Sequence, residues 1–426
     1  MNGRHSKALL PVFLHQKTYK NEVMKMNKIE QYLENNWDKC IRESRFDEGT
    51  LLGLPYPYTV PSVEAFNEIY YWDTYFTNVG LLNSGRAMLA KQNTDNILYL
   101  VDKYGFMPNG SRTYYLTRSQ PPFLFAMVRD ICDYYDDNVW LNGAYFALCK
   151  EYKFWMNERI APNGLNRYSP NPDPDTFSEL AEGFKSRTKT NPDTPEEELA
   201  RHCLGTCESG WDMTPRWDFE AHNFNAADLN SLLFAMEKNM AYFAEKLGYS
   251  EDVAVWNTRA EKRLELMNKF MLDKNNLFLD YNFKTNRLSR IFSAASYYPL
   301  YAKAATPEQA AAAAENLRRL EAEFGILTCE KNDSGVLYQW DYPNGWACLQ
   351  YIVMVGLNNY GYTDDAKRIA QKYVTLAEKV FDETGALWEK YNVVDGSINV
   401  NNEYKMPTML GWSAGVYIAA QKFLKQ

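Results

Sequence analysis

The chain has 426 residues, of which 46% are hydrophobic and 15% aromatic, which is ample for a large core and excludes a disordered protein. Its formal net charge is -8, and no stripe of lysine and arginine follows an expected helix, which argues against nucleic acid as a partner. The apolar stretch 8–14 is broken by Pro11 and lacks a cleavage site of small residues, and no segment has the roughly 18 apolar residues of a membrane helix. We therefore expect a globular protein in the cytoplasm, with no membrane anchor.

The first half of the chain divides into an N-terminal arm and the start of a larger domain. We expect segment 1–53 to be a helical arm that packs on a catalytic domain, 54–426, in which no linker rich in Gly, Ser or Pro occurs. Segment 169–192 is the longest stretch that we expect to be irregular, and it is flanked by predicted helices, as a functional loop would be. Thr-Pro-Glu-Glu at 194–197 combines a capping box with proline at the first helical position, and so predicts the start of a helix. Another helix is predicted at 229–247, where apolar residues recur at helical spacing before a glycine.

The second half continues the helical pattern. A helix is predicted at 250–267, whereas 276–281 is the best candidate for a strand, as one arm of a short hairpin. Thr-Pro-Glu-Gln at 306–309 is a second capping box with proline, and it leads an alanine-rich helix expected over 307–325. A further helix is predicted at 363–380. The fold class predicted is all-α, and consecutive antiparallel helix pairs favour a closed toroid of about a dozen helices over a four-helix bundle.

The cysteines indicate neither disulfides nor a metal site. They are seven in number, scattered and unevenly spaced, and we expect them to be reduced core residues. Cys203 and Cys207 with His202 resemble one corner of a metal site, but no second Cys/His pair lies near in the sequence, so no metal is predicted. Because the chain also lacks a glycine-rich phosphate loop and an acidic calcium loop, no cofactor is expected.

Three tryptophan–aspartate dipeptides, at 72–73, 211–212 and 340–341, place carboxylates beside flat apolar rings, as a sugar pocket requires. Hydrolysis of a glycosidic bond usually takes two acids on separate segments, one to protonate the leaving oxygen and one to activate water or attack carbon. The sequence therefore has to supply two such carboxyls.

Asp212 is the first candidate acid. Trp211 and Trp217 should remove water from its carboxyl and so favour the protonated form that a proton donor needs. Glu389, within Leu-Trp-Glu-Lys-Tyr, is the second candidate. An aspartate beside a tryptophan is also a common helix cap or indole N–H acceptor, so spacing alone leaves both interpretations open.

Several ordered motifs resemble the trehalase family of glycoside hydrolases. Phe-Asn-Glu-Ile-Tyr-Tyr-Trp-Asp-Thr-Tyr-Phe at 66–76 resembles the first signature of that family, and Gln-Trp-Asp-Tyr-Pro-Asn-Gly-Trp-Ala at 339–347 resembles its second. Segments 104–110 and 114–122 continue the match, and Glu-Tyr at 403–404, followed by Gly-Trp, is similar to the closing segment of the family. The similarity covers most of the chain.

The resemblance implies an (α/α)6 toroid that hydrolyses trehalose or a related small α-linked glucoside with inversion. Asp212 would be the general acid and Glu389 the general base. The implied partner is a small carbohydrate, with neither cofactor nor metal. The residues expected to bind the sugar are Phe66, Trp72, Asp73, Asn109, Arg118, Gln120, Gly210, Trp211, Gln339, Trp340, Asp341, Trp346, Glu403 and Trp412. Among them, Asp73 and Asp341 could instead tie loop backbone N–H groups together, and Arg118 could be a buried ion-pair partner.

The chain also departs from the family pattern. Ala65 stands where a sugar-binding arginine is expected, and Asp173, in Asp-Pro-Asp-Thr-Phe, replaces the arginine of Arg-Pro-Glu-Ser-Tyr. The glycine-rich lid is reduced at 395–402. An arginine that binds hydroxyls as a fork cannot become alanine without leaving partners unpaired or admitting water. We therefore expect retained chemistry and an altered substrate.

Other functions stay open at this point. The acid motif, with Trp211 and Pro215, also resembles the related processing-glucosidase and mannosylglycerate-hydrolase family, so a different α-glycoside is an alternative substrate. A non-catalytic sugar-binding relative would explain the missing arginines, although the presence of both acids argues against it. A lyase or phosphorylase would need residues that we do not find, and the oligomeric state is not predicted.

Overall fold

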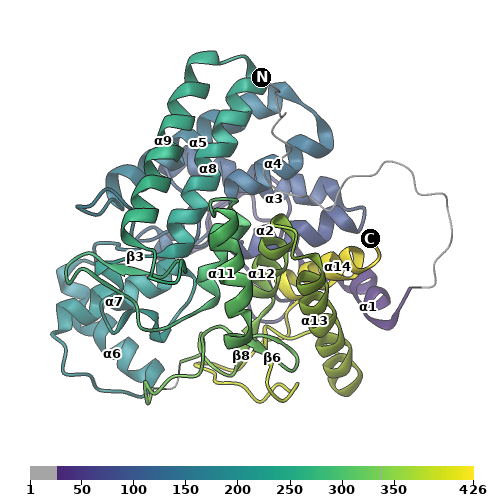
Figure 1. Ribbon diagram of the computed structural model, residues 1–426. Helices are drawn as coiled ribbons and strands as arrows, with labels where there is room; N and C mark the ends of the chain where they lie inside the picture. The colour runs from purple at the N-terminus through teal and green to yellow at the C-terminus, as the bar shows by residue number, and fades with distance from the viewer. Residues whose placement is uncertain (1–25, 337) are drawn as a thin grey trace.

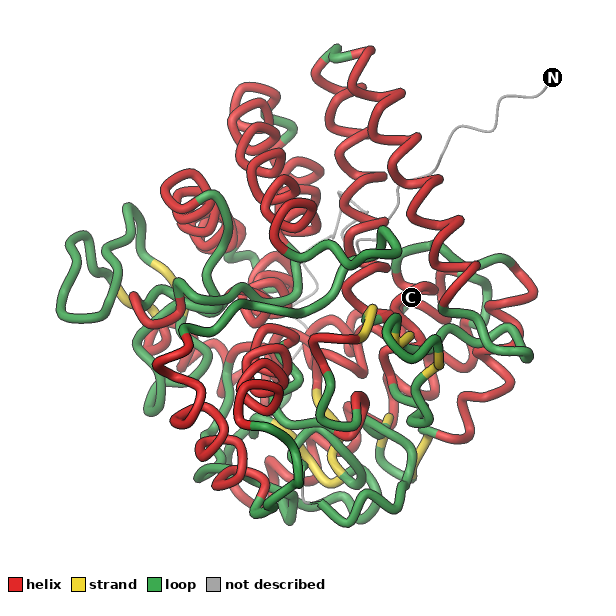
Figure 2. Tube along the Cα trace, turned by 90° about the vertical axis from the view of Figure 1, so that its left-hand side faces the viewer, coloured by secondary structure: helices red, strands yellow, loops and turns green. Residues whose placement is uncertain are grey.

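Helices dominate the residues that the computed structural model describes, 26–336 and 338–426 (Figure 1). The α-helices of that part are α1 (Lys28–Asn36), α2 (Tyr71–Asn83), α3 (Ala87–Tyr104), α4 (Leu124–Tyr135), α5 (Asn138–Glu158), α6 (Phe177–Thr188), α7 (Glu196–Ser209), α8 (Ala227–Leu247), α9 (Ser250–Phe270), α10 (Tyr298–Tyr301), α11 (Pro307–Asn316), α12 (Ala347–Asn359), α13 (Thr363–Thr384) and α14 (Gly411–Leu424). The strands are short: β1 (Ile41–Arg42), β2 (Tyr58–Thr59), β3 (Phe224–Asn225), β4 (Tyr281–Asn282), β5 (Arg287–Leu288), β6 (Glu321–Ala322), β7 (Gly325–Ile326), β8 (Asn344–Trp346) and β9 (Lys390–Asn392). Figure 2 shows most of them among the longer loops in the lower part of the molecule. Within the described ranges, no helix combines the length and apolarity needed to cross a bilayer.

The helices form an inner and an outer layer. Helices α2, α4, α8, α12 and α14 are buried on nearly every side, whereas α3, α5, α9 and α13 leave much of their surface exposed. A helix that is apolar all round belongs inside, and an amphipathic helix covers it. Inner and outer helices pack in chain order, α2 with α3, α4 with α5, α8 with α9 and α12 with α13. This alternation is the arrangement expected of an (α/α)6 toroid.

The ring closes where the last helix, α14, packs against the first inner helix, α2. Gly80 and Gly415 face each other at this contact. A Cβ added to Gly80 would lie 2.5 Å from the Cα of Gly415, and one added to Gly415 would meet the carbonyl of Phe76. Only glycine therefore allows the two backbones to approach this closely.

The N-terminal arm contacts the toroid through α1 and β1. Residues 1–25 of the predicted arm lie outside the described part of the chain. Asn27 starts α1 with a capping box, and its side-chain amide donates to the hydroxyl of Tyr417 in α14 at 2.9 Å. Strand β1 pairs antiparallel with β2, which lies beyond the arm. We propose, on these contacts, the division that the sequence predicts: an arm, 1–53, and a catalytic domain, 54–426.

Several predicted helices are confirmed. Helix α8 covers the predicted residues and ends before Gly248, whose φ is +82°. Helix α9 begins at Ser250, and α13 begins at Thr363 and extends beyond the predicted end. The second capping box forms as expected, with the Thr306 hydroxyl accepting from the N–H of Gln309. For these helices, an apolar face or a capping motif in the local sequence was sufficient to predict where the helix lies.

Other predicted elements are wrong. Helix α11 ends at Asn316 rather than Gly325, because a 3-10 turn and the β6–β7 hairpin follow it. Pro195, not Thr194, is the N-cap of α7, and no side chain caps that helix start. The strand predicted at 276–281 reaches the sheet only with its last residue, because β4 lies further along and pairs with β3 and β5. Tertiary contacts set these boundaries.

The loop predicted at 169–192 is also wrong, since it contains α6. Helix α6 packs against α7, and the two helices share a second, smaller hydrophobic core. The buried members of this core are Ala181, Phe184, Leu199, Cys203, Cys207, Met213 and Tyr338. The α6–α7 pair thus has a core distinct from the large core of the toroid, and its chain continues directly into the candidate site.

Candidate active site

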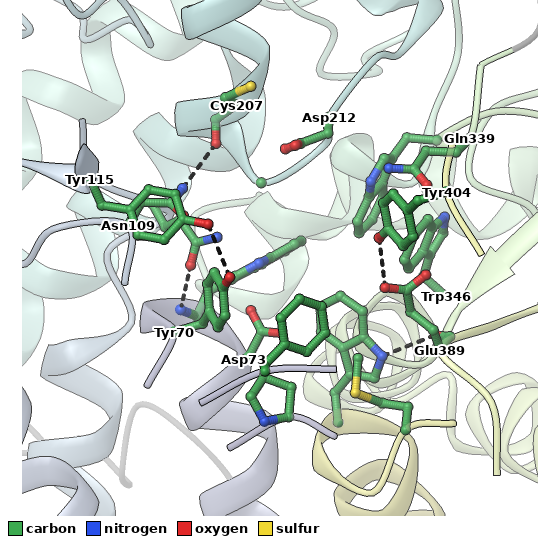
Figure 3. Close-up of a pocket in the computed structure, with 18 of the residues that line it drawn as sticks. Tyr70, Asp73, Asn109, Tyr115, Cys207, Asp212, Gln339, Trp346, Glu389 and Tyr404 are labelled. Carbon is green, nitrogen blue, oxygen red and sulfur yellow. Dashed lines mark hydrogen bonds between the residues drawn. The ribbon is translucent and has the colours of Figure 1, made fainter. Parts of the chain in front are cut away.

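A cavity of about 240 Å³ gathers most of the predicted site residues (Figure 3). Those that line it are Phe66, Trp72, Asp73, Asn109, Arg118, Gln120, Gly210, Asp212, Gln339, Trp340, Trp346, Glu389 and Trp412. Six other residues line the cavity and were not predicted from the sequence: Pro61, Tyr70, Tyr115, Cys207, Tyr404 and Met409. Three of these, Tyr70, Tyr115 and Tyr404, stand within the quoted motifs, so their position beside motif residues was the signal that could have identified them. The lining segments are far apart in sequence and meet only in the closed toroid.

Four tryptophans form one wall of the cavity. Trp340 stacks on Trp346, with ring centroids 3.7 Å apart and planes 2° apart. Trp72 lies 5.5 Å from Trp340 and 5.9 Å from Trp412, measured between ring centroids. Each ring is held by the others and by the large core. They offer a rigid, flat surface to a ligand with an apolar face.

Glu389 is held by donors on both of its carboxylate oxygens. The Nζ of Lys390 donates to Oε2 at 2.7 Å, and the hydroxyl of Tyr404 donates to Oε1 at 2.7 Å. Lys390 is fully buried and also donates to Gln339 at 3.3 Å. The indole N–H of Trp412 donates to the backbone carbonyl of Glu389 at 3.0 Å. A buried charge needs such partners, and here the ammonium compensates the carboxylate.

Asp212 projects from the turn that follows α7. Gly210 ends α7 with φ +72°, and a Cβ at this position would lie 2.7 Å from the ring of Trp72, so only glycine fits. The Asp212 side chain is 32% exposed, and its Oδ2 accepts a hydrogen bond from Arg187 at 2.9 Å. Figure 3 shows Asp212 and Glu389 on different sides of the cavity.

A buried glutamate fixes the end of α7 before this turn. Glu208 is fully buried and accepts from the guanidinium of Arg159, with the shortest contact at 2.8 Å. It also accepts from the backbone N–H groups of Ser119 and Ser169, at 3.0 and 3.1 Å. Since Ser119 lies between two residues that line the cavity, this carboxylate ties two walls of the site together.

Trp211 and Trp217 both contact Arg216, and the side chain of the neighbouring Asp212 stays 32% exposed. Both rings pack on the guanidinium of Arg216, whose central carbon lies 4.3 and 4.5 Å from their centroids. Arg216 also pairs with two buried aspartates, at 3.1 and 2.8 Å. A guanidinium is attracted to the face of an indole, so the two rings anchor the segment after Asp212. Trp211 consequently lies outside the cavity.

Arg187, near the end of α6, reaches the site although the sequence analysis did not single it out. Its Nη2 donates to Asp212 at 2.9 Å, its Nε to Glu403 at 2.6 Å, and its Nη1 to the Sγ of Cys207 at 3.5 Å. Glu403, expected to bind the sugar, lies buried beside Arg187 and outside the cavity lining. Burial raises the pKa of the Glu403 carboxyl to about 8, although Arg187 lowers it.

The other two Trp-Asp aspartates occupy different environments. Asp73 lines the cavity, and burial raises its pKa to about 8, with further increases from the charges of Glu389 and Asp212. Asp341 lies outside the cavity lining. Its Oδ1 accepts from the side-chain amide of Asn332 at 2.8 Å and from the backbone N–H of the next residue at 2.7 Å. Asp341 therefore ties a loop together, which is the structural alternative to a sugar contact.

Three polar residues from the motif segments 104–110 and 114–122 also line the cavity, namely Asn109, Arg118 and Gln120. The amide of Asn109 donates to the carbonyl of Cys207 at 3.2 Å, and Gln120 accepts from the N–H of Trp72 at 3.2 Å. The guanidinium of Arg118 lies over the ring of a tyrosine, and its buried Nε has no hydrogen-bond partner among the described residues. Arg118 thus retains a donor for a ligand.

Ala65 and Asp173, which stand where the family pattern has arginines, are both exposed and lie outside the cavity lining. Asp173 accepts from the N–H of Asp175 at 3.1 Å and caps a 3-10 turn. Ala65 has no polar side chain to offer. The guanidinium that contacts Asp212 is supplied by Arg187 instead.

Comparisons with known proteins agree with the fold. A periplasmic trehalase of Xanthomonas axonopodis pv. citri (strain 306) is 33% identical over 418 residues, which cover 91% of this chain and 72% of that protein. The structure of neutral trehalase Nth1 from Saccharomyces cerevisiae is similar with a TM-score of 0.76 and 31% identity, covering 94% of this chain and 80% of that chain. A GH63 mannosylglycerate hydrolase from Thermus thermophilus has a TM-score of 0.62 at 13% identity, over 93% of this chain and 100% of that chain, and so shares the fold alone. The predicted (α/α)6 toroid is confirmed.

The comparisons also correct the predicted location. Several curated relatives, from Xanthomonas and Escherichia coli, are named periplasmic trehalases, so the expected cytoplasmic location is wrong. That prediction depended on the lack of a recognised leader in the first residues, which lie outside the described part. The lack of a recognised leader pattern in one short segment does not establish where a protein is located.

A family model described as Trehalase matches residues 6–425. The match covers nearly the whole chain, and the cavity with its two held carboxylates lies inside it. The protein is therefore an α-glycoside hydrolase with a small carbohydrate as substrate, and it belongs to the trehalase family.

Proposed function

We propose that this protein hydrolyses trehalose, or a closely related small α-linked glucoside, with inversion at the anomeric carbon. The observation that carries the proposal is one small cavity in which two carboxylates, Asp212 and Glu389, lie on different sides and are held by different partners. The names of the matched relatives support trehalose as the first substrate to test.

The proposed roles of the two acids follow from the chemistry of inversion. Asp212 protonates the glycosidic oxygen, and Glu389 takes a proton from the water that attacks the anomeric carbon from the opposite face. Lys390 and Tyr404 suit Glu389 to this role because they fix both carboxylate oxygens. Since water enters opposite the leaving oxygen, the sugar released has the inverted configuration.

The cavity favours a small substrate. Its volume of about 240 Å³ lies below the roughly 300–1,000 Å³ of pockets that hold drug-sized ligands, which favours a ligand of one or two sugar units. Asp73, whose pKa burial raises to about 8, is protonated at neutral pH and can donate to a sugar oxygen. The absence of a guanidinium at Ala65 is the specific reason to keep a different α-glucoside as the second candidate.

The test is a hydrolysis assay on the purified full chain with trehalose and other α-linked disaccharides, following the released anomer by NMR. We expect inverted glucose from at least one substrate, and Asp212→Asn or Glu389→Gln should lower kcat by several orders of magnitude. Asp218→Asn is the matched control, since Asp218 follows in the same segment but is exposed and, among the described residues, forms its ion pair with Arg290. Its activity should equal that of the unaltered protein.

The outcomes separate the candidates. Turnover of another α-glucoside without turnover of trehalose would replace trehalose but keep the chemistry. Release of the retained anomer would contradict the inverting mechanism. Sugar binding with no turnover on any substrate would overturn the hydrolase proposal and favour a sugar-binding relative.

The location that we propose is the periplasm, on the names of the matched relatives. The described cysteines are free thiols, and all but Cys149 are buried. Burial limits their oxidation in an oxidising compartment. Fractionation of the source cells, with the activity followed in each fraction, tests this location.

A further inference from the structure

We propose that Asp212 and Glu403 act as a pair that shares one proton, and that Arg187 is the positioning residue that pairs with whichever carboxyl is ionised. This inference rests on the proposed function, in which Asp212 is the general acid. It gives α6 and Glu403 specific tasks in the reaction.

One guanidinium joins the two carboxyls. Arg187 donates from Nη2 to the Oδ2 of Asp212 at 2.9 Å and from Nε to the Oε2 of Glu403 at 2.6 Å. The Arg187 and Asp212 side chains are 30% and 32% exposed, whereas that of Glu403 is 2% exposed. Arg187 thus lies between a carboxyl that faces the cavity and one that is enclosed by protein. It can shift its charge between them by small changes of hydrogen-bond length.

Glu403 is incompletely satisfied by the described residues. Its Oε1 is buried and has no hydrogen-bond partner among them. An unpaired oxygen of a buried carboxylate is costly, and a proton on the carboxyl or the full charge of Arg187 relieves that cost. Glu403 therefore has two favourable states, protonated or tightly paired with the arginine.

The groups around the pair come from several elements. Helix α6 brings Arg187, α7 brings the thiol of Cys207, and the segment before α14 brings Glu403 and the hydroxyl of Tyr404. Asp212 completes the set from the turn after α7. Burial raises the pKa of Glu403 to about 8, so this carboxyl holds a proton at neutral pH. With Glu403 neutral, the charge of Arg187 is directed at Asp212, which it contacts at 2.9 Å.

This resting arrangement poses a problem for a proton donor. Asp212 has to carry a proton before it can give one to the glycosidic oxygen, and an ion pair with Arg187 opposes protonation. Glu403 solves the problem because it holds the missing proton and offers Arg187 a second partner.

The step that follows conserves protons and charge. As the sugar occupies the cavity, Glu403 releases its proton to water, Asp212 takes one up from water, and Arg187 pairs with the Glu403 carboxylate. Asp212 then gives this proton to the glycosidic oxygen, which keeps the electrons of the breaking C–O bond. Glu389 takes a proton from the attacking water and returns it to solvent, from which the Asp212–Glu403 pair regains one proton.

The test is the variant Glu403→Gln, assayed with trehalose or the active α-glucoside from about pH 5 to pH 9. Glutamine can neither hold nor release the proton, so Arg187 stays with Asp212. We expect kcat at neutral pH to fall by about 10- to 100-fold while KM changes by less than about threefold. The alkaline limb of kcat/KM should move to lower pH by about one unit or more.

Two further variants test the role of Arg187 and control for substitutions in α6. Arg187→Lys leaves a point charge that cannot hold both carboxyls in the fork geometry, and its alkaline limb should move in the same direction. Lys185→Gln is the matched control on α6, because Lys185 pairs with Glu182 on the surface at 2.9 Å. Its rate and pH profile should equal those of the unaltered protein.

An unmoved alkaline limb in Glu403→Gln overturns the proposal, as does an equal loss in Lys185→Gln. If circular dichroism shows that Glu403→Gln is unfolded, the limb of Arg187→Lys decides in the same way. Loss of activity in Asp212→Asn with an unmoved limb in Glu403→Gln would remove the shared proton and leave the hydrolase proposal intact.

A readout without turnover separates the two proposals if no sugar is hydrolysed. Burial raises the pKa of Glu403 from 4.5 to about 8, so the folded protein should lose stability as pH rises between these values. Glu403→Gln lacks this loss. Equal pH dependence of the unfolding free energy in the two proteins would overturn the shared-proton pair on its own.

Discussion

Replacing Asp73 by asparagine should stabilise the folded protein at neutral pH, by an amount that grows with pH. Burial raises the pKa of Asp73 from 3.8 to about 8, and the charges of Glu389 and Asp212 add to the rise. Below 3.8 the carboxyl is protonated in both the folded and the unfolded state and costs nothing. Between 3.8 and about 8 only the unfolded chain ionises, so the folded state loses stability as pH rises.

The size of the effect follows from the shift. About three pH units separate 3.8 from neutral pH, and each unit corresponds to about 1.36 kcal/mol, so the Asp73 carboxyl costs the folded protein about 4 kcal/mol at pH 7. Asparagine has the same shape and no charge, but its buried amide lacks a full set of partners, which costs about 1–3 kcal/mol. The variant should therefore be more stable by about 1–3 kcal/mol at pH 7, and no more stable than the unaltered protein near pH 4.

Denaturant unfolding followed by circular dichroism, at several pH values between about 4 and 8, measures this difference. Buried carboxyls that do not interact with Asp73 contribute equally in both proteins and cancel. The exposed control Asp218→Asn should show no pH-dependent difference from the unaltered protein. Asp73→Asn should also weaken hydrolysis, since a buried acid in a sugar site is a functional group kept at a cost in stability. A stability difference that stays constant from pH 4 to pH 8 would refute the reasoning.

Three further predictions concern the cavity walls. Gly210→Ala should destabilise the protein by at least about 1–2 kcal/mol and lower its activity, because Gly210 has a positive φ and the ring of Trp72 lies close to it. Gly143→Ala is the control and should have neither effect, because a Cβ at Gly143 would meet no atom within 4 Å. Equal unfolding midpoints of the two variants would contradict this prediction. Among the described cysteines, Cys207 should react fastest with iodoacetamide near neutral pH, and substrate should protect it. The reason is that a hydrogen bond from the thiol of Cys203, together with the nearby guanidinium groups, lowers the pKa of Cys207 to about 7. Faster labelling of another cysteine, measured by peptide mass spectrometry, would refute this prediction. Lys390→Met should lower the unfolding free energy by about 3–5 kcal/mol and abolish turnover, because it leaves the buried carboxylate of Glu389 without its ion-pair partner. An active variant of unchanged stability would argue against Glu389 as the base.

The parts of the fold that could be predicted are those that a local pattern encodes. Helices α8 and α13 each have an apolar stripe that the spacing of their residues reveals. Helix α11 is alanine-rich and has a weak stripe, so its residues mark no end point within the predicted range. In the structure Leu317 and Leu320 turn into the core, and the chain leaves the helix there. The end of α11 is thus set by packing, which spacing alone does not report.

Helix α6 carried a signal that was overlooked. Its buried residues, Ala181, Phe184 and Thr188, follow the three- and four-residue spacing of a helix. Gly183 and the turn-forming residues on both sides make the segment resemble a loop. Even a correct helix would not have identified Arg187, because its importance depends on meeting two carboxyls from distant segments.

The candidate site was predicted to the extent that its residues belong to motifs. The tryptophan wall, Asp73 and Glu389 stand within them and line the cavity. The expectation for Trp211 failed because a tryptophan beside an aspartate in sequence need not contact its side chain. The backbone after Gly210 turns the ring of Trp211 toward Arg216 and the carboxyl of Asp212 toward Arg187. Neighbours in sequence therefore serve two separate clusters.

The division of hydrophobic cores suggests how this site could lose two expected arginines and still hold its acid. The tryptophan wall and Trp211 belong to the large core of the toroid, whereas Cys207 and Met213, on either side of the acid turn, belong to the core of the α6–α7 pair. Cores are closely packed, so a substitution is felt mainly within its own cluster. A change in α6 can therefore bring Arg187 to Asp212 without repacking the wall that holds Glu389. On this argument the guanidinium at the acid is the adjustable part of the site, and the base with its aromatic wall is the fixed part.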